Sequence, residues 1–384
     1  MPPGLAEEVR KTGLEAGLDA VGVAPARPFE DTRRHLEERR QAGLHGGMAF
    51  TYRNPARSTE PERILPGAQA IVVGARRYPS RRSVAGGESE GGGQSASRPM
   101  GVVARYASAD YYQPLRDGLA AVADRLRAAG FRATVVADDN ALVDRAAAHR
   151  AGLGWYGKNT NLLLPGNGSW FVLGSVVTDA ALPSARQPLA DGCGSCRRCL
   201  PACPTGALVA PGVLDARRCL AWLVQAPGVF PREYRAALGA RLYGCDDCQE
   251  VCPENVAADR AAAAADGRIT AHDTSDSPAV DLLELLAASD DELMGRHGRW
   301  YIPRRQPRYL RRNALVALGN IADGRDPDVE MALRRALADP DPILRAHAVW
   351  AASRLARPDL IAPLIDDDDP TVRQEIAWAN GDLT

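Results

Sequence analysis

Four cysteines crowd into one short stretch of this chain. The segment CGSCRRCLPACP, residues 193–204, has the spacing C-x2-C-x2-C-x3-C-P. A second segment, CDDCQEVCP at residues 245–253, repeats the ending C-x2-C-x3-C-P. Only eight cysteines occur among the 384 residues, and the remaining one, Cys219, lies between the two segments. This pattern constrains the fold strongly, because all of the cysteines fall within one region of about sixty residues.

The spacing is that of a bacterial ferredoxin with two clusters. In such proteins three closely spaced thiolates ligate one 4Fe–4S cluster, and the fourth cysteine, which precedes a proline, ligates the other. Cys219 then replaces the missing first cysteine of the second run. We expect one cluster on Cys193, Cys196, Cys199 and Cys252, and a second on Cys203, Cys219, Cys245 and Cys248. Two tetrahedral zinc sites are the alternative, which the spacing disfavours.

Charge and hydropathy argue against a membrane-spanning or exported protein. The chain has 47 basic and 48 acidic residues, a net charge of −1, and no apolar run long enough to span a membrane. Its first residues, MPPGLAEEVRKTGLEAGL, lack the apolar core of a signal peptide. We therefore expect a soluble, cytoplasmic protein with no membrane partner, in which reduced cysteines bind metal instead of forming disulfides.

The positive charge comes almost entirely from arginine. The only lysines are Lys11 and Lys158. Because arginine fills nearly every position that needs only positive charge, a lysine suggests a chemical role. Lys158 lies in AGLGWYGKNTNLL, residues 151–163, which is glycine-rich but lacks the spacing of a dinucleotide-binding loop. The residues by themselves therefore predict an iron–sulfur oxidoreductase with an α/β partner domain.

Alternating helix and strand patterns predict that α/β domain at residues 1–184. Helical periodicity predicts helices at residues 5–18, 31–43, 111–130 and 140–152. Apolar runs predict strands at residues 19–26, 68–78 and 131–137, and a strand or strand pair at residues 169–179. This order favours helices covering a sheet. The Gly/Ser-rich stretch Val84–Pro99 predicts a mobile loop within the domain.

The second half divides into two further predicted domains. Residues 185–257 form the ferredoxin-like module, and residues 258–384 form a linker and an all-α repeat domain, the linker lying within AADRAAAAADGRITAHDTSDSP. The segments at 339–351 and 367–379 superimpose at a spacing of 28 residues, with turn residues before a helical pattern. Such a pattern is typical of stacked helix pairs of the HEAT-like class, which serve as scaffolds or binding surfaces.

At this point the chain resembles the epoxyqueuosine reductase family over nearly its whole length. The resemblance is carried by the segments at 138–179, 193–208, 214–223 and 241–255, and by RNALVALGN at 312–320. It implies reduction of epoxyqueuosine to queuosine at the wobble position of tRNA, with loss of water. It also implies that a nitroreductase-like N-terminal domain binds cobalamin, which the two clusters reduce. An external low-potential electron donor and a monomeric state are further expectations.

The resemblance implies specific residues for the reaction. Asp138 opens the motif D-x-x-x-x-x-[DE]-R and matches the family's proton donor to the departing oxygen. An aspartic acid has an ordinary pKa near 3.9, so its carboxyl must be desolvated to donate a proton near neutrality. On local grounds either Asp138 or its neighbour Asp139 could instead cap a helix. The other implied cofactor-binding residues are Arg57, Tyr106, Lys158, Asn159, Leu162, Ser169 and Asp246.

The sequence departs from the family pattern at two places. It has Asp110-Tyr111-Tyr112 where the family often has Asp-Tyr-His, which argues against a histidine role there. It has Gln225-Ala226-Pro227 where the family often has a basic residue, which leaves one tRNA contact unassigned.

The arginine-rich segment GRHGRWYIPRRQPRYLRRN, residues 295–313, is the predicted tRNA interface. Arginine binds phosphate, and an aromatic face can stack on an unpaired base. The predicted nucleic-acid contacts are Arg299, Arg304, Arg305, Arg308 and Arg312. A solvated helix face with core aromatic residues is an equally good interpretation of the segment by itself.

Two other functions remain open from the sequence. One is a cobalamin- and iron–sulfur-dependent reductase of a small molecule, similar to reductive dehalogenases, which typically carry an export leader and lack a repeat tail. The other is a non-catalytic electron-transfer or binding protein dominated by the repeats. Turnover of epoxyqueuosine-containing tRNA distinguishes all three.

Overall fold

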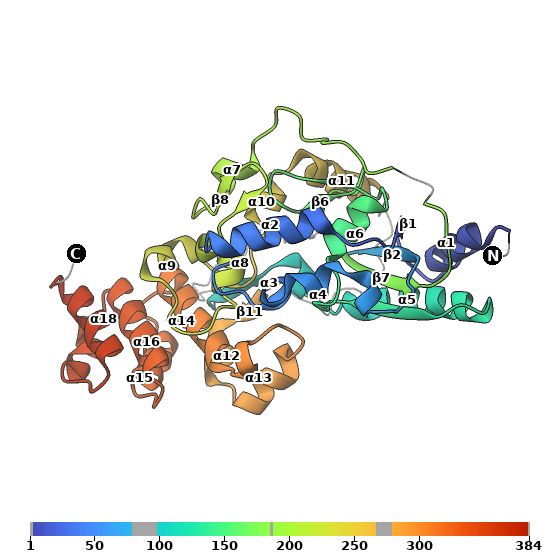
Figure 1. The fold of residues 1–384 in the computed structure, drawn as a ribbon. Helices are drawn as coiled ribbons and strands as arrows, with labels where there is room; N and C mark the ends of the chain where they lie inside the picture. Colours follow the sequence, from blue (N-terminus) through green and yellow to red (C-terminus); the bar gives the residue numbers. More distant parts are fainter. Residues whose placement is uncertain (1–2, 79–97, 185–186, 266–278, 383–384) are drawn as a thin grey trace. The chain divides into compact units, whose positions relative to one another are not determined.

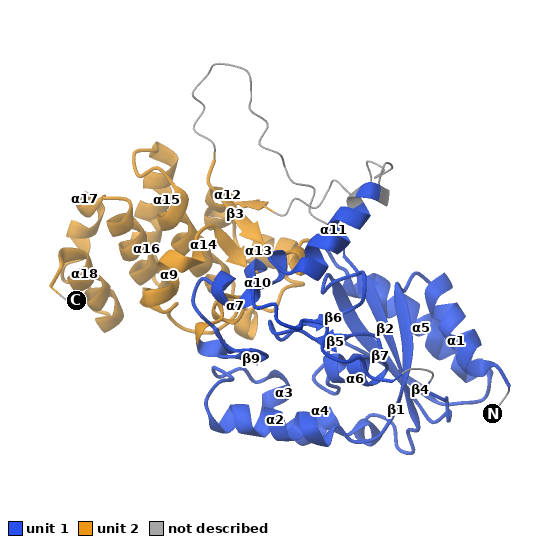
Figure 2. Ribbon diagram, turned by 90° about the horizontal axis from the view of Figure 1, so that it is seen from above, with its two compact units in different colours: residues 1–81, 109–217, 246–273 blue, residues 82–108, 218–245, 274–384 orange. Residues whose placement is uncertain are grey.

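The computed structural model describes residues 3–78, 98–184, 187–265 and 279–382. The chain forms two compact units, coloured separately in Figure 2: residues 1–81, 109–217 and 246–273 form unit 1, and residues 82–108, 218–245 and 274–384 form unit 2. The three predicted consecutive domains do not coincide with these units, because the predicted ferredoxin-like module is divided between them. Most of the predicted loop Val84–Pro99 lies outside the described residues.

Unit 1 is built on a four-stranded antiparallel sheet (Figure 1). The strands lie in the order β1 (Ala20–Pro25), β2 (Ala70–Arg77), β7 (Phe171–Thr178) and β4 (Ala133–Ala137). Its longer helices are α1 (Leu5–Glu15), α2 (Glu30–Gln41), α5 (Tyr112–Ala128), α6 (Asp144–Arg150) and α11 (Pro253–Ala265). Shorter elements are α3 (Phe50–Arg53), α4 (Pro55–Thr59), α7 (Cys199–Ala202), α10 (Asp247–Glu250), β5 (Trp155–Tyr156), β6 (Leu162–Leu163), β8 (Leu208–Ala210) and β9 (Val213–Leu214).

Helices cover both faces of this sheet, as the strand pattern predicts. Because side chains alternate across a strand, Ile71 and Val73 of β2 face one side, where they pack with Ala147 of α6. Gly74 and Gly174 are directly paired between β2 and β7. A Cβ atom at either position would lie within 3.0 Å of a Leu119 methyl carbon, so the paired glycines let α5 pack closely on the opposite face.

Unit 2 joins a three-stranded sheet to a stack of helices. The sheet has the order β10 (Arg241–Tyr243), β3 (Met100–Val103) and β11 (Ala279–Asp281). The helices are α8 (Leu220–Leu223), α9 (Arg232–Leu238), α12 (Leu282–Ala287), α13 (Asp290–His297), α14 (Arg308–Ile321), α15 (Pro327–Leu337), α16 (Pro342–Arg354), α17 (Pro358–Ile361) and α18 (Pro370–Asn380). Their buried faces form one continuous core with the sheet.

The predicted repeat is present in the last helices. Asp341 and Asp369 cap α16 and α18, each accepting a hydrogen bond from the backbone N–H two residues later, and each precedes a proline at the first helical position. Asp326 caps α15 in the same way. Aspartate followed by proline is a favourable start for a helix, which explains why the turn residues recur with the helical pattern.

Two predicted elements differ from the structure. The helix predicted at residues 140–152 begins only at Asp144, because Asp139 forms a local turn by accepting the Ala141 N–H at 2.8 Å. The segment predicted as a linker is helical in its first part, since α11 continues to Ala265. In the part of the chain that the structure describes, no helix is long and apolar enough to cross a membrane.

Candidate iron–sulfur and catalytic site

Four of the predicted cluster ligands lie near one another in unit 1. Cys193 and Cys196 lie on the turn before α7, Cys199 begins α7, and Cys252 immediately precedes α11. Burial raises the pKa of the Cys199 thiol, and the nearby thiols of Cys193, Cys252 and Cys196 raise it further. Burial also raises the pKa of Cys252, with Cys193 and Cys196 contributing. These mutual interactions place together the four residues predicted to hold the first cluster.

The arrangement fits a cluster better than thiols without metal. Several thiolates in one partly buried site repel one another, and bound iron removes that penalty by neutralising their charge. Within the described ranges, no three Cys, His, Asp or Glu side chains converge on a point as the ligands of a single metal ion do. A cubane has no such requirement, because each thiolate binds its own iron at a separate corner.

The other four cysteines come from both units. Cys203 and Cys248 belong to unit 1, whereas Cys219 and Cys245 belong to unit 2. Burial tends to raise the pKa of the Cys203 thiol, but hydrogen bonds from Thr205 and Ala207 outweigh it and lower the pKa; the Ala207 N–H lies 3.2 Å from the sulfur. Such donors favour the thiolate, the form that ligates iron. The assignment of these four cysteines to a second cluster remains a prediction.

The hairpin formed by β5 and β6 brings the GKN sequence onto the cysteine segments. Lys158 Nζ donates hydrogen bonds to the carbonyl oxygens of Gly194, at 2.5 Å, and Cys196, at 2.9 Å. Asn159 Nδ2 donates to the Cys248 carbonyl oxygen at 3.3 Å. In this structure both side chains hydrogen-bond to the backbone of the cysteine segments, and the corrin-facing contacts that the family resemblance implies remain a prediction.

Asp138 lies directly after the edge strand β4 in an uncommon conformation. Its φ angle is 54°, in the left-handed region that aspartate tolerates better than most residues. Although part of the side chain reaches solvent, burial raises the pKa of the Asp138 carboxyl; Arg116 opposes this shift, whereas Asp139 and Asp110 add to it. The raised pKa is what a carboxylic acid needs in order to donate a proton closer to neutral pH.

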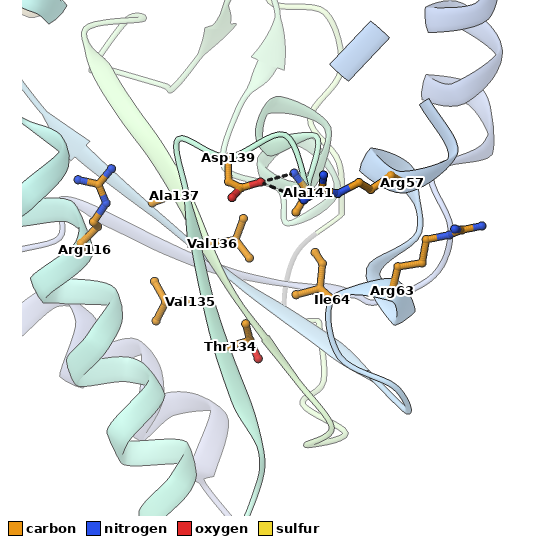
Figure 3. Close-up of a pocket in the computed structure, with 10 residues that line it drawn as sticks. All are labelled: Arg57, Arg63, Ile64, Arg116, Thr134, Val135, Val136, Ala137, Asp139 and Ala141. Carbon is orange, nitrogen blue, oxygen red and sulfur yellow. Dashed lines mark hydrogen bonds and ion pairs between the residues drawn. The ribbon is translucent and has the colours of Figure 1, made fainter. Parts of the chain in front are cut away.

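Asp139, the rival proton donor, has structural partners. Its Oδ1 accepts the Ala141 N–H and lies 3.9 Å from Arg57 Nη2, as the dashed lines in Figure 3 show. Asp139 and Arg57 line a cavity of about 370 Å³ beside β4, together with Arg116 and Arg63. A corrinoid is larger than the drug-sized ligands that cavities of about 300–1,000 Å³ hold. This cavity could therefore contact only an edge of that cofactor.

Two polar residues near Asp138 had no predicted role. Burial raises the pKa of Asp144 well above its usual value, and the negative charge of Asp138 contributes. Burial likewise raises the pKa of the Tyr112 phenol, with Asp138 and Asp144 adding to the shift. The only sequence signal was the position of Asp144 as the acidic residue of the D-x-x-x-x-x-[DE]-R motif. Both groups therefore lie close enough to Asp138 for its charge to raise their pKa values.

Other predicted cofactor-binding residues are engaged within the protein. Leu162 is 2% exposed and belongs to the core between the sheet and α6. Ser169 is 5% exposed, and its Oγ and N–H bond to Gln249 and Asn255. Both side chains are engaged within the protein in this structure, and their predicted cofactor contacts remain predictions. Asp246 is also buried and accepts a hydrogen bond from Gln249, whereas the Tyr106 hydroxyl in unit 2 accepts one from Gln225.

The predicted tRNA contact of Arg312 is wrong. Its side chain is fully buried and donates hydrogen bonds to the backbone carbonyl oxygens of Ala226, Gly228, Leu223 and Val224. Arg308 is paired with Asp341 at 3.1 Å, and Arg299 donates to the carbonyl oxygens of Ala107 and Ser108. Trp300 and Tyr309 are core residues. Much of the segment therefore fastens α14 and its neighbours within unit 2.

A smaller basic surface remains in the same segment. Arg304 and Arg305 are exposed and adopt consecutive left-handed backbone conformations, with φ angles of 52° and 57°. Tyr301 nearby is 57% exposed, whereas Arg305 donates one hydrogen bond to the Gly298 carbonyl oxygen. Strained, exposed residues often mark functional positions. Arg304, Arg305 and Tyr301 form what we call the exposed basic turn.

Comparisons with known protein families match both the cysteine-rich segment and the helical repeats. Residues 192–255 match the 4Fe-4S double cluster binding domain family, and residues 302–381 match the HEAT repeats family. Both predicted modules are thereby confirmed. An epoxyqueuosine reductase of Xanthomonas campestris is 34% identical over 359 residues, covering 92% of this chain and 97% of the relative.

The folds of two solved structures are similar to this one over nearly the whole chain. An epoxyqueuosine reductase crystallised with an epoxyqueuosine-modified tRNA-Tyr stem loop has a TM-score of 0.84 and 31% identity, covering 98% of this chain and 97% of that one. The Bacillus subtilis enzyme, solved with its aspartate catalytic loop swung out of the active site, has a TM-score of 0.83 and 30% identity, with 99% of each chain covered.

Proposed function

The chain belongs to the epoxyqueuosine reductase family, and from that premise we propose that it reduces epoxyqueuosine to queuosine at the wobble position of tRNA. The observation that carries this proposal is the similarity over nearly the whole chain, together with the double-cluster family match at residues 192–255, a range that contains all eight cysteines. The protein is then an oxidoreductase that uses cobalamin and two 4Fe–4S clusters and acts in the cytoplasm, where tRNA is found.

The conversion of the epoxide to an alkene consumes two electrons and two protons and releases water. Cobalamin, when bound, supplies the reducing electrons at the substrate carbon. The clusters accept electrons one at a time from an external low-potential carrier, and the protein acts as a monomer. The chain's own contribution at the reacting centre is the acid that protonates the departing oxygen.

Asp138 is the residue that we assign to this proton transfer. It follows an edge strand on a short loop, its carboxyl has a raised pKa, and it is not held by the turn that engages Asp139. The aspartate catalytic loop described for the Bacillus subtilis enzyme supports an aspartate in this role. Arg57 and Arg116, on either side of the adjoining cavity, are placed to orient an anionic or polar group.

The exposed basic turn is our candidate for contact with tRNA phosphates. Changing both Arg304 and Arg305 to Gln should weaken binding about equally for modified and unmodified anticodon stem loops, because phosphate contacts carry no sequence information. The plot of log affinity against log salt should flatten by roughly 0.7 to 0.9 for each arginine–phosphate pair that the substitutions remove. Fluorescence anisotropy at several salt concentrations measures both quantities.

An Arg335→Gln variant is the control for this measurement. Arg335 is an exposed arginine on α15 whose guanidinium lies 3.6 Å from the Met331 sulfur, so its replacement removes one positive charge, half of what the double variant removes, at another place in unit 2. A double variant whose salt slope equals that of Arg335→Gln and of the unaltered protein would remove the exposed basic turn from the tRNA interface.

Genetic complementation tests the proposed function in cells. The gene, expressed in a bacterial strain that lacks its own epoxyqueuosine reductase, should replace epoxyqueuosine by queuosine in total tRNA nucleosides. Mass spectrometry of the digested tRNA measures the ratio. Epoxyqueuosine that persists beside abundant, iron-loaded protein would contradict the proposal and favour the small-molecule reductase.

A further inference from the structure

Lys158 is one of two lysines in the chain, and the structure shows what its ammonium group contacts. Nζ donates to the carbonyl oxygens of Gly194 and Cys196, at 2.5 and 2.9 Å. Both carbonyls belong to the turn that carries Cys193 and Cys196, in which the Cys196 N–H donates to the Cys193 carbonyl oxygen at 3.0 Å. The ammonium group is therefore fastened to the backbone that presents two ligands of the first cluster.

The hairpin that carries Lys158 is itself fixed against the cysteine-rich segments. The Gly212 N–H donates to the Lys158 carbonyl oxygen at 2.9 Å. Gly192, just before the first ligand, lies against the Trp155 ring so closely that a Cβ atom there would be 2.6 Å from ring carbons. Asn159 holds the Cys248 carbonyl oxygen. The ammonium position is thus determined by several contacts and not by a flexible side chain alone.

The charge of Lys158 is not neutralised by an acidic side chain. Across residues 3–78, 98–184, 187–265 and 279–382, no carboxylate forms an ion pair with its Nζ, and its hydrogen-bond partners are two neutral carbonyl oxygens. Lys11, the other lysine, instead has Glu15 at 3.6 Å on an exposed helix. A half-buried, uncompensated charge acts over a longer range than an exposed one, which solvent screens.

Such a charge has a definite effect on a neighbouring cubane. Reduction adds one electron and makes a four-thiolate cluster more negative, and a fixed positive charge favours that reduced form. Hydrogen bonding, net charge and solvent exposure are the factors by which a protein sets the potential of an iron–sulfur cluster. Lys158 supplies positive charge directly and fixes the turn through its two hydrogen bonds.

We propose that Lys158 is a positioning residue that raises the reduction potential of the cluster bound by Cys193, Cys196, Cys199 and Cys252. The inference rests on the proposed iron–sulfur function, in which a one-electron, low-potential carrier reduces this cluster. Arginine should replace Lys158 less well, since its planar guanidinium group is wider than the compact ammonium group.

A redox titration with dithionite, followed by electron paramagnetic resonance, tests the proposal on the iron-loaded protein. Lys158→Gln keeps a hydrogen-bond donor but removes the charge. We expect the potential of one cluster to become more negative by the equivalent of about a tenfold change in the reduction equilibrium, which is about 59 mV for one electron. The other cluster should change less. The matched control, Lys11→Gln, should leave both potentials unchanged.

Two outcomes would overturn the proposal. One is Lys158→Gln with full iron content and unaltered potentials for both clusters. The other applies if Lys158→Gln loses the first cluster: Lys158→Arg, which retains the charge, would then be titrated, and a potential more negative than that of the unaltered protein by about 59 mV or more would refute the electrostatic role. Neither result depends on turnover, so a protein that reduces epoxyqueuosine normally could still contradict this inference.

Discussion

Replacing Asp138 by Asn should lower the turnover of epoxyqueuosine-containing tRNA about 10²-fold or more. Asparagine keeps the size and much of the hydrogen bonding of aspartic acid, but it cannot supply a proton to the departing oxygen. The affinity for the tRNA stem loop should be nearly unchanged, because Asp138 is not part of the basic surface. Single-turnover kinetics with saturating protein separates these two effects.

The pH dependence of turnover provides a second readout of the same residue. Burial raises the pKa of Asp138, so the protonated donor persists above the range of an ordinary aspartic acid. Turnover that requires this proton should be highest below the raised pKa and should fall as the pH increases through it. In Asp138→Asn that decline should disappear from the residual rate.

Asp139→Asn is the matched control for this assignment. An asparagine carbonyl can still accept the Ala141 N–H that Asp139 holds, so the local turn should persist. Its turnover should remain within a few-fold of the unaltered protein, since its carboxylate reaches Arg57 only at 3.9 Å. If Asp139→Asn abolishes turnover and Asp138→Asn does not, the proton donor is the neighbouring residue.

Replacing Cys219 by Ala should remove about half of the iron. Two cubanes contain roughly eight irons per chain, and we assign Cys219 to the second, so the variant should retain about four. The resonance signal of the first cluster should persist, whereas turnover should be lost because electrons no longer pass between two clusters. Iron analysis of anaerobically purified protein measures the first effect.

The reciprocal variant, Cys252→Ala, tests whether the last cysteine of the second cysteine segment ligates the cluster held by the first segment. It should remove the first cluster and leave the second, although Cys252 belongs to the second cysteine run in sequence. Stoichiometric zinc with little iron in the unaltered protein would contradict the cluster assignment altogether. Loss of the same signal in both variants would show that the ligands are grouped differently.

The sequence was most informative where local patterns determine structure. Cysteine spacing identified the double-cluster module, and the Asp-Pro starts of α16 and α18 identified the repeats, because both signals lie within a few neighbouring residues. The strands of the main sheet were predicted for the same reason. Their order was not, since β4 pairs with β7, which comes later than the intervening hairpin β5–β6.

Long-range contacts explain the predictions that were wrong or absent. Arg312 has the sequence features of a solvated helix residue, but α14 packs against α9, α12, α16 and β10, so it is enclosed. The carbonyl oxygens that compensate its charge belong to a segment over eighty residues earlier. Lys158 was singled out from the scarcity of lysine, yet its carbonyl partners could be identified only from the fold.

The central claim is that this chain removes the epoxide oxygen of epoxyqueuosine in tRNA. The most direct measurement incubates the anaerobic, iron-loaded protein with cobalamin, a low-potential reductant and an epoxyqueuosine-modified stem loop, and analyses the nucleosides by mass spectrometry. We predict queuosine as the product, formed only when both cobalamin and iron are present and at a strongly reduced rate with Asp138→Asn. Unchanged epoxyqueuosine in the presence of fully loaded, tRNA-binding protein would contradict the claim.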